Sequence, residues 1–273
     1  MKMDNKIAVL TGAGNGIGEA LAKRIASAGA RGVLVSDLNE ADAQRVAADI
    51  VAKGGRAFGM AADVSSEAAI QRLVVAAESR FGPVDLFCSN AGIVDEGGAD
   101  ALDSKWVRSW NINVMAHVFA ARAVLPSMLA RGNGYLLSTC SAAGLLTSPG
   151  AAPYAVTKHA AIALAEWLSI THGDAGIKVS VICPQAVRTK LLEDSINSGN
   201  AASDAFAKVG KLLQPDEVAA CVMKGLEDEI FLILPHPEVQ GFVERKVSNV
   251  DRWLAGMRRL IAGLGAIPAE KVR

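Results

Sequence analysis

The stretch Ile7-Ala8-Val9-Leu10-Thr11-Gly12-Ala13-Gly14-Asn15-Gly16-Ile17-Gly18 decides the fold. Its first four residues form a short apolar run, which is typical of a strand buried in a parallel sheet. A glycine-rich turn follows, and residues 19–28 have the Ala-rich pattern of a helix. This order of strand, turn and helix presents backbone N–H groups to a phosphate. Ile17 stands where G-x-G-x-x-G has its last glycine, so the prediction rests on the place of the turn between strand and helix.

Apolar runs and helical patterns alternate along the rest of the chain. Further strands are expected over 32–37, 55–62, 84–88, 135–140, 177–183 and 230–234. Such alternation predicts βαβ units with right-handed crossovers and a parallel sheet. Ligands bind such sheets beyond the carboxyl ends of the strands. The residues expected there are Thr11, Asp37, Asp63, Asn90 and Ser141. We therefore expect a single domain over 1–273, an α/β doubly wound sheet with helices on both faces.

Composition excludes several classes of partner. The 273 residues are 51% hydrophobic, and Lys+Arg and Asp+Glu number 28 each. No basic block favours nucleic acid or an acidic membrane surface. We find no signal-peptide core and expect no apolar stretch of the ~18 residues that a membrane span needs. The four cysteines lack C-x-x-C spacing and the four histidines lack metal-ligand spacing. The expectation is a cytoplasmic protein with reduced thiols, no metal and a small-molecule substrate.

Tyr154-Ala155-Val156-Thr157-Lys158 carries the chemistry. On a helix, residues four apart share a face, so Lys158 can hold its ammonium beside the Tyr154 phenol. A nearby cation lowers the pKa of a phenol, which is ~10 in free tyrosine, towards the range useful for proton transfer. Ser141 ends the preceding strand and would converge on the same point. Alone, this spacing also fits a surface Tyr and Lys on one helix face.

Asp37 ends the second strand and Leu38 follows it. An acidic residue about 20 positions beyond the glycines can accept hydrogen bonds from a ribose 2′-OH and repels a 2′-phosphate. This favours NAD over NADP. The alternative is a helix N-cap, formed by Asp37 or Asn39.

The long helical stretch 104–131 contains Asn113. An amide inside an apolar helix must find hydrogen-bond partners. Taken alone, Asn113 is read as a structural tie to a neighbouring backbone.

Across residues 5–235 these motifs resemble the short-chain dehydrogenase/reductase family, in its form of about 250 residues. The match rests on the glycine turn, Asp63-Val64, Asn90-Ala91-Gly92, Asn113, Ser141, Tyr154 and Lys158, which occur in the family's order. The resemblance implies a Rossmann-like sheet of seven parallel strands, and hydride transfer between a nicotinamide and a carbonyl or alcohol carbon. It also implies a homodimer or homotetramer.

The resemblance assigns roles to individual residues. Tyr154 becomes the general acid/base, Ser141 polarises the substrate oxygen, and Lys158 binds the nicotinamide ribose and lowers the Tyr154 pKa. Asn113 holds a water that links Lys158 to solvent. The residues expected to bind the cofactor are Gly12, Asn15, Gly16, Ile17, Gly18, Asp37, Leu38, Asp63, Val64, Asn90, Ala91, Gly92, Tyr154, Lys158, Pro184, Val187 and Thr189.

The sequence departs from the family at three places. Gln185 replaces the usual glycine after the sixth strand, and Pro235-His236-Pro237 replaces a glycine-rich ending. A tail with apolar residues at threes and fours then predicts an amphipathic helix over 238–264. This helix would pack on its own subunit, contact another subunit, or cover the active site. Residues 190–213 are expected to form a mobile loop over the substrate.

We therefore expect an NAD(H)-dependent oxidoreductase that interconverts a secondary alcohol and a ketone of mainly apolar character, such as a hydroxysteroid or an aryl or alkyl alcohol. Arg188 and Lys190 could grip an anionic substrate, although exposed loop charges explain them as well. The residues expected to line the substrate pocket are Ser141, Ala143, Leu145, Gln185, Leu191 and Leu192. The alternatives are an NADP(H)-dependent carbonyl reductase and a dinucleotide-binding regulator without turnover.

Overall fold

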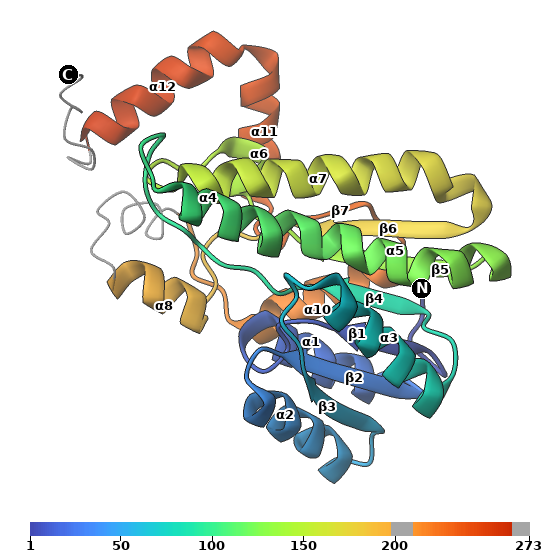
Figure 1. Ribbon diagram of the computed structural model, residues 1–273. Helices are drawn as coiled ribbons and strands as arrows, with labels where there is room; N and C mark the ends of the chain where they lie inside the picture. The colour runs from blue at the N-terminus through green and yellow to red at the C-terminus, as the bar shows by residue number, and fades with distance from the viewer. Residues whose placement is uncertain (198–209, 264–273) are drawn as a thin grey trace.

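A seven-stranded parallel sheet forms the centre of the molecule (Figure 1). The structure is a computed structural model, and it describes residues 1–197 and 210–263. The strand order is β3-β2-β1-β4-β5-β6-β7, which confirms the predicted doubly wound parallel sheet. The strands are β1 (Ile7–Leu10), β2 (Gly32–Asp37), β3 (Ala57–Ala61), β4 (Leu86–Ser89), β5 (Gly134–Thr139), β6 (Ile177–Ile182) and β7 (Leu232–Ile233).

Helices cover both faces of this sheet. On one face lie α1 (Gly16–Ser27), α2 (Glu40–Ala52) and α10 (Pro215–Glu227). On the other lie α3 (Glu67–Phe81), α5 (Ala116–Arg131) and α7 (Ala152–His172), which the 3-10 turn η2 (Gly173–Ala175) follows. Alternate residues of β1 supply the two cores, because Val9 faces the second set of helices while Ala8 and Leu10 face the first. Burial on both sides explains why the strands read as unbroken apolar runs.

The predicted helix 104–131 is interrupted. It consists of α4 (Asp103–Trp110), a π-helical turn η1 (Asn111–Met115) and α5. By length and composition this segment, 103–131, could cross a membrane, because its most apolar window of 18 residues has a mean hydropathy of 1.4. The expectation that no stretch would be long enough is therefore wrong. Its most apolar window is 44% buried within the protein, and the helix packs against α3, β4 and β5. Packing in the core of the fold accounts for its apolar character.

The tail also differs from the prediction. Instead of one helix over 238–264 it forms two, α11 (Glu238–Ser248) and α12 (Val250–Gly263). Asn249 separates them, because its backbone is extended and its Oδ1 accepts a hydrogen bond from the Arg252 N–H at 2.9 Å. This is an N-cap, which starts a new helix. In Figure 1, α12 extends away from the sheet above α8.

The predicted loop 190–213 begins with a helix, α8 (Lys190–Asn197). Residues 198–209 of that prediction lie outside the described residues. The chain returns at Gly210 and pairs Leu213 with Val187 in a short parallel bridge.

Candidate active site

The glycine turn follows β1 at the point where the strand order reverses between β1 and β4. Gly12 has a φ of +59°, and a Cβ there would lie 2.6 Å from the Ala91 Cα. A Cβ on Gly18 would lie 2.4 Å from the Gly12 carbonyl oxygen. Side chains at these positions would collide with backbone, so the turn needs glycine to pack against β4. Gly18 consequently lies beneath the turn rather than on the cavity surface.

Asn90 braces the turn to two other strand ends. Its Nδ2 donates to the carbonyl oxygens of Thr11 at 3.0 Å and Gly12 at 2.8 Å, and its Oδ1 accepts from the Thr139 hydroxyl at 3.0 Å. The Thr139 carbonyl oxygen in turn accepts from Lys158 Nζ at 2.9 Å. Hydrogen bonds through Asn90 and Thr139 thus join the glycine turn to Lys158 in α7.

Asp37 faces the same turn. Its Oδ2 accepts from the Gly14 N–H at 2.9 Å and its Oδ1 from the Asn39 N–H at 3.1 Å. The α2 N-cap is Asn39, whose side chain accepts from the Ala41 N–H, so the capping alternative does not apply to Asp37. One cation that contacts the turn, Arg45, donates to the Gly14 carbonyl oxygen and pairs with Glu19 at 3.0 Å. An arginine already paired with a carboxylate is poorly placed to receive a 2′-phosphate.

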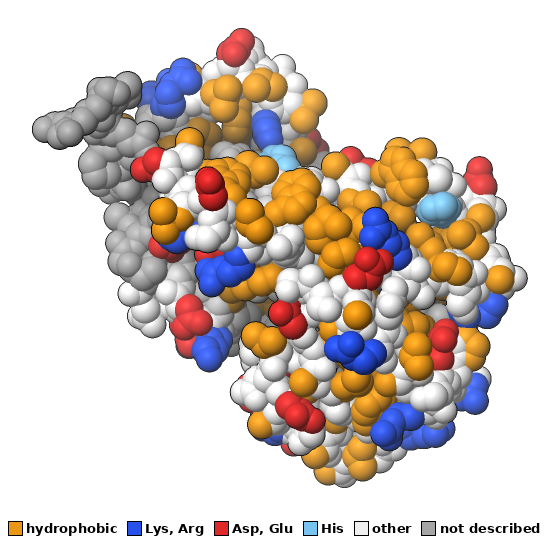
Figure 2. Space-filling view, in the orientation of Figure 1, with side chains coloured by type: hydrophobic (Ala, Val, Ile, Leu, Met, Phe, Trp, Pro, Cys, Tyr) orange, Lys and Arg blue, Asp and Glu red, His pale blue; other side chains and the backbone are white. Residues whose placement is uncertain are grey.

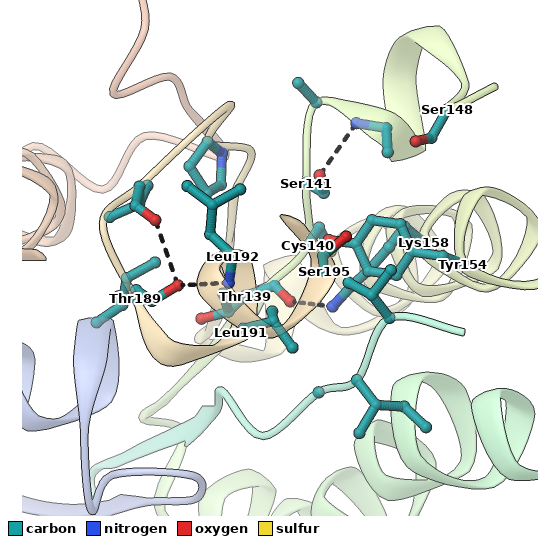
Figure 3. Close-up of a pocket in the computed structure, with 18 of the residues that line it drawn as sticks. Thr139, Cys140, Ser141, Ser148, Tyr154, Lys158, Thr189, Leu191, Leu192 and Ser195 are labelled. Carbon is teal, nitrogen blue, oxygen red and sulfur yellow. Dashed lines mark hydrogen bonds between the residues drawn. The ribbon is translucent and has the colours of Figure 1, made fainter. Parts of the chain in front are cut away.

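Ser141, Tyr154 and Lys158 come together as predicted, with Ser141 just beyond β5 and the other two on α7 (Figure 3). The Ser141 Oγ accepts from the Ala143 N–H at 3.1 Å and also hydrogen-bonds to the Tyr154 phenol. Lys158 is only 3% exposed, and its Nζ lies 5.7 Å from the centroid of the Tyr154 ring. The reading of Tyr154 and Lys158 as a surface pair is therefore wrong.

The predicted direction of the Tyr154 pKa is wrong for this structure. Burial raises the pKa of Tyr154 to about 12, and the hydrogen bond from Ser141 only partly opposes that rise. Burial also lowers the pKa of Lys158, whose ammonium is directed to the Thr139 carbonyl oxygen. Desolvation disfavours the charged form of both groups and is the largest cause of each shift. The phenol is therefore protonated at neutral pH.

Asn113 lies in the π-helical turn, behind the cavity wall. Its Oδ1 accepts from the Ile93 N–H and its Nδ2 donates to the Ile93 carbonyl oxygen, both at 3.0 Å. The Nδ2 also donates to the Thr157 hydroxyl at 3.1 Å. This is the structural tie expected from the residue itself. Its side chain fixes the segment after β4 to α7, while the water relay implied by the family resemblance stays a prediction.

A cavity of about 690 Å³ connects these parts. Every predicted cofactor residue except Gly18 lines it, from the glycine turn to Thr189. A Cβ on Gly16 would lie 3.1 Å from Thr189 Cγ2, so the absence of a side chain keeps this part of the cavity open. The predicted substrate residues that line it are Ser141, Ala143, Gln185, Leu191 and Leu192. The prediction for Leu145 is wrong, because this side chain packs towards α11. Its neighbour Leu146, an apolar position also expected in the pocket, lines the cavity from α6 (Ala143–Leu146).

The tail helices supply a wall that the list of predicted site residues lacks. The residues concerned are Phe242, Arg245, Trp253, Met257 and Leu260. The spacing of apolar residues at threes and fours predicts an amphipathic tail, and covering the active site is one of its three expected roles. The sequence does not show which face of the tail lines the cavity, because that face depends on the turn at Asn249. Thr139 and Ser148 were also missed.

A sequence model of the family described as short chain dehydrogenase matches residues 6–199, which is more than half of the chain. The chain belongs to the short-chain dehydrogenase family. The strand order and the grouping of Ser141, Tyr154 and Lys158 agree with that assignment.

Other short-chain dehydrogenases are similar over most of this chain. A 1-deoxy-11-beta-hydroxypentalenate dehydrogenase of Streptomyces exfoliatus is 31% identical over 256 residues, covering 92% of this chain and 90% of the relative. A cyclohexanol dehydrogenase of an Acinetobacter species is 33% identical over 230 residues, covering 84% and 90%. A short-chain dehydrogenase/reductase of Burkholderia phymatum, solved in complex with NAD, has a TM-score of 0.84 and 28% identity, covering 92% and 96%.

Two of the departures from the family pattern meet in this short-chain dehydrogenase. The Gln185 N–H donates to His236 Nδ1 at 3.1 Å, and His236 Nε2 lies 2.9 Å from the Lys211 carbonyl oxygen. Because Nδ1 accepts, Nε2 carries the proton and donates. His236 is 1% exposed. It therefore ties the turn after β6 to the start of the tail and to the chain that returns at residue 210.

Among the described residues, no group of three or more His, Cys, Asp or Glu side chains is placed to hold a metal ion. Cys88, Cys140, Cys183 and Cys221 are all free thiols.

Proposed function

We propose that this short-chain dehydrogenase interconverts a secondary alcohol and a ketone of mainly apolar character, using NAD(H). The observation that carries the proposal is the convergence of Ser141, Tyr154 and Lys158 on the cavity that the glycine turn also lines. Reaction groups and a dinucleotide cradle in one cavity are what hydride transfer to a carbonyl requires.

The residues present fit a dinucleotide. Gly12 and Gly16 adopt positive φ and leave the space that a pyrophosphate needs, and the first turn of α1 borders it. The Asp37 carboxylate stands where it can accept a hydrogen bond from a ribose 2′-OH. When bound, the nicotinamide would supply or accept the hydride. Asp37, the paired Arg45 and the solved relative with NAD support NAD over NADP.

The chain's own groups handle the proton and the substrate oxygen. In ketone reduction, the Tyr154 phenol gives its proton to the carbonyl oxygen as that oxygen gains charge. The Ser141 hydroxyl, which is hydrogen-bonded to the same phenol, would hold and polarise the carbonyl oxygen of the substrate. The buried Lys158 ammonium would stabilise the phenolate left behind, since an opposite charge favours the ionised form. Alcohol oxidation needs the reverse transfer, with Tyr154 as the base.

Apolar side chains support the choice of substrate. Ile93, Val94, Leu146, Trp253 and Met257 line the cavity around the catalytic groups. These walls offer few partners to a sugar or a free phosphate. The named substrates of the two relatives, 1-deoxy-11-beta-hydroxypentalenate and cyclohexanol, support the same choice.

The test is initial-rate turnover of a panel of cyclic, aryl and steroid ketones with NADH and with NADPH. We expect NADH-dependent reduction of at least one class. Tyr154→Phe should reduce kcat by about 10²-fold or more while NADH still binds. Comparable rates with NADPH would favour the NADP-linked reductase. No turnover with either cofactor, despite NADH binding, would favour the regulator.

We also propose a homo-oligomer, with α4 and α7 in its interface. Figure 2 shows hydrophobic side chains gathered over these helices, and the large exposed ones are Val107, Trp110, Val156, Trp167 and Ile170. Exposed apolar patches of this kind mark protein contacts. Light scattering should give a dimer or tetramer, and Ile170→Glu, at a position 85% exposed, should shift it towards monomer. A monomeric wild type would refute this part.

A further inference from the structure

Arg245 is a cation on the cavity wall that forms no ion pair with any of the described residues. It lies in the last turn of α11, and its side chain lines the cavity together with Phe242. Its Cζ is 4.9 Å from the centroid of the Phe242 ring. In the described part of the chain no carboxylate lies within ion-pair distance of it. The guanidinium is therefore held by an aromatic face while its N–H donors remain available.

The other charges of the cavity do not neutralise Arg245. Asp37 and Asp63 belong to the part assigned to the dinucleotide, and Lys158 is bonded to Thr139. On the substrate side α8 contributes Lys190 and Asp194, which are exposed and opposite in sign. Among the described residues, Arg245 is thus a charge without an opposite partner, and its neighbours on this wall are apolar, namely Leu146, Trp253, Met257 and Leu260.

The position of Arg245 is fixed relative to the catalytic serine. Val239 of the same helix is 0% exposed and packs against Ala142 and Leu146. Lys246 Nζ donates to the Leu145 carbonyl oxygen, in the short helix that follows Ser141. His236 anchors the start of α11. A group bound by Arg245 would therefore have a defined separation from the reacting carbon.

We propose that the substrate is an apolar ketone or alcohol that carries a carboxylate, and that Arg245 binds this carboxylate. A planar guanidinium pairs with a carboxylate through two parallel hydrogen bonds, and the opposite charges of the partners make these bonds stronger than neutral ones. Arg245 itself is exposed to solvent. The apolar walls would cover the hydrocarbon between the carboxylate and the reacting carbon. This inference rests on the proposed function and specifies its substrate class.

The test compares ketones with and without the charge. The substrates are 4-oxocyclohexyl carboxylic acids with side chains of increasing length, and their methyl esters, reduced with NADH. The wild type should prefer the acid of best length by about 10- to 100-fold in kcat/KM, the range for a hydrogen bond to a charged group. Arg245→Gln should remove that preference. Arg252→Gln is the matched control, because Arg252 lines only the smaller neighbouring cavity, and it should keep the wild-type ratio.

A binding measurement separates this inference from the proposed function. Calorimetry of the full chain with saturating NADH should show dodecanoate binding about tenfold more tightly than dodecanol, and Arg245→Gln should abolish the difference. Preserved dodecanoate selectivity without turnover of any ketone would refute the proposed function and leave the carboxylate site standing. Equal kcat/KM for acids and esters, or an equal loss with both in Arg245→Gln, would overturn the carboxylate site.

Discussion

His236→Phe tests whether the tail is coupled to the active-site turn. Phenylalanine keeps the size of the ring and removes both of its hydrogen bonds, to the Gln185 N–H and the Lys211 carbonyl oxygen. An unpaired buried N–H costs about 1–3 kcal/mol. Lys211 is exposed, so water can replace the second bond at little cost. The free energy of unfolding should therefore fall by about 2 kcal/mol, which lowers Tm by about 4–8 °C in a chain of this size.

The assay is urea unfolding followed by tryptophan fluorescence, together with the KM for the ketone. KM should rise, because the turn that carries Gln185 lines the cavity. His159→Phe is the control: His159 is exposed on α7, and among the described residues its ring has one hydrogen-bond partner, the Ala155 carbonyl oxygen in the same helix. This variant should change stability by less than about 0.5 kcal/mol. If His236→Phe is as mild as the control, the histidine does not hold the turn and the reasoning fails.

Three further predictions concern the cofactor site and the proton. Asp37→Ser should raise the ratio of NADPH to NADH use by about tenfold or more, because it removes a charge that repels a 2′-phosphate. Measuring kcat/KM with both cofactors tests this, and an unchanged ratio would contradict it. Ketone reduction should stay level between about pH 6 and 9 while alcohol oxidation rises with pH, because a Tyr154 pKa of about 12 keeps the acid form present and the base form scarce; a fall in reduction near neutral pH would assign the proton to another group. Gly12→Ala should destabilise the protein by at least about 2 kcal/mol more than Gly54→Ala. Both sites have positive φ, but only at Gly12 would the new Cβ lie 2.6 Å from a backbone atom, the Ala91 Cα. Equal losses in thermal unfolding would show that the turn can relax.

The sequence predicts the sheet well because both faces of it are buried. Runs such as Ile7–Leu10 leave little choice but a buried strand, and a strand followed by a glycine turn and a helix leaves little choice but a parallel crossover. The polar residues at the strand ends could be named in advance for the same reason. Ser141, Tyr154 and Lys158 meet because helix periodicity and strand direction are local rules.

Other features depend on three-dimensional packing. The pKa of Tyr154 rises because the phenol is desolvated, and burial of a single ring is not visible in spacing. The partners of Asn113 in the π-helical turn, Ile93 and Thr157, come from other parts of the fold and cannot be read from local spacing. The break at Asn249, in contrast, had a sequence signal: an asparagine followed by Val250 and Asp251 is typical of a helix start.

The bonds from Gly12 through Asn90 and Thr139 to Lys158 have a practical consequence for engineering. If the glycine turn is redesigned for a different coenzyme, any displacement of its backbone would pass through these hydrogen bonds to the Lys158 amine beside Tyr154. Gains in coenzyme choice would then come with slower turnover. Compensating changes should be sought at the Asn90–Thr139 junction rather than among the residues that touch the nucleotide.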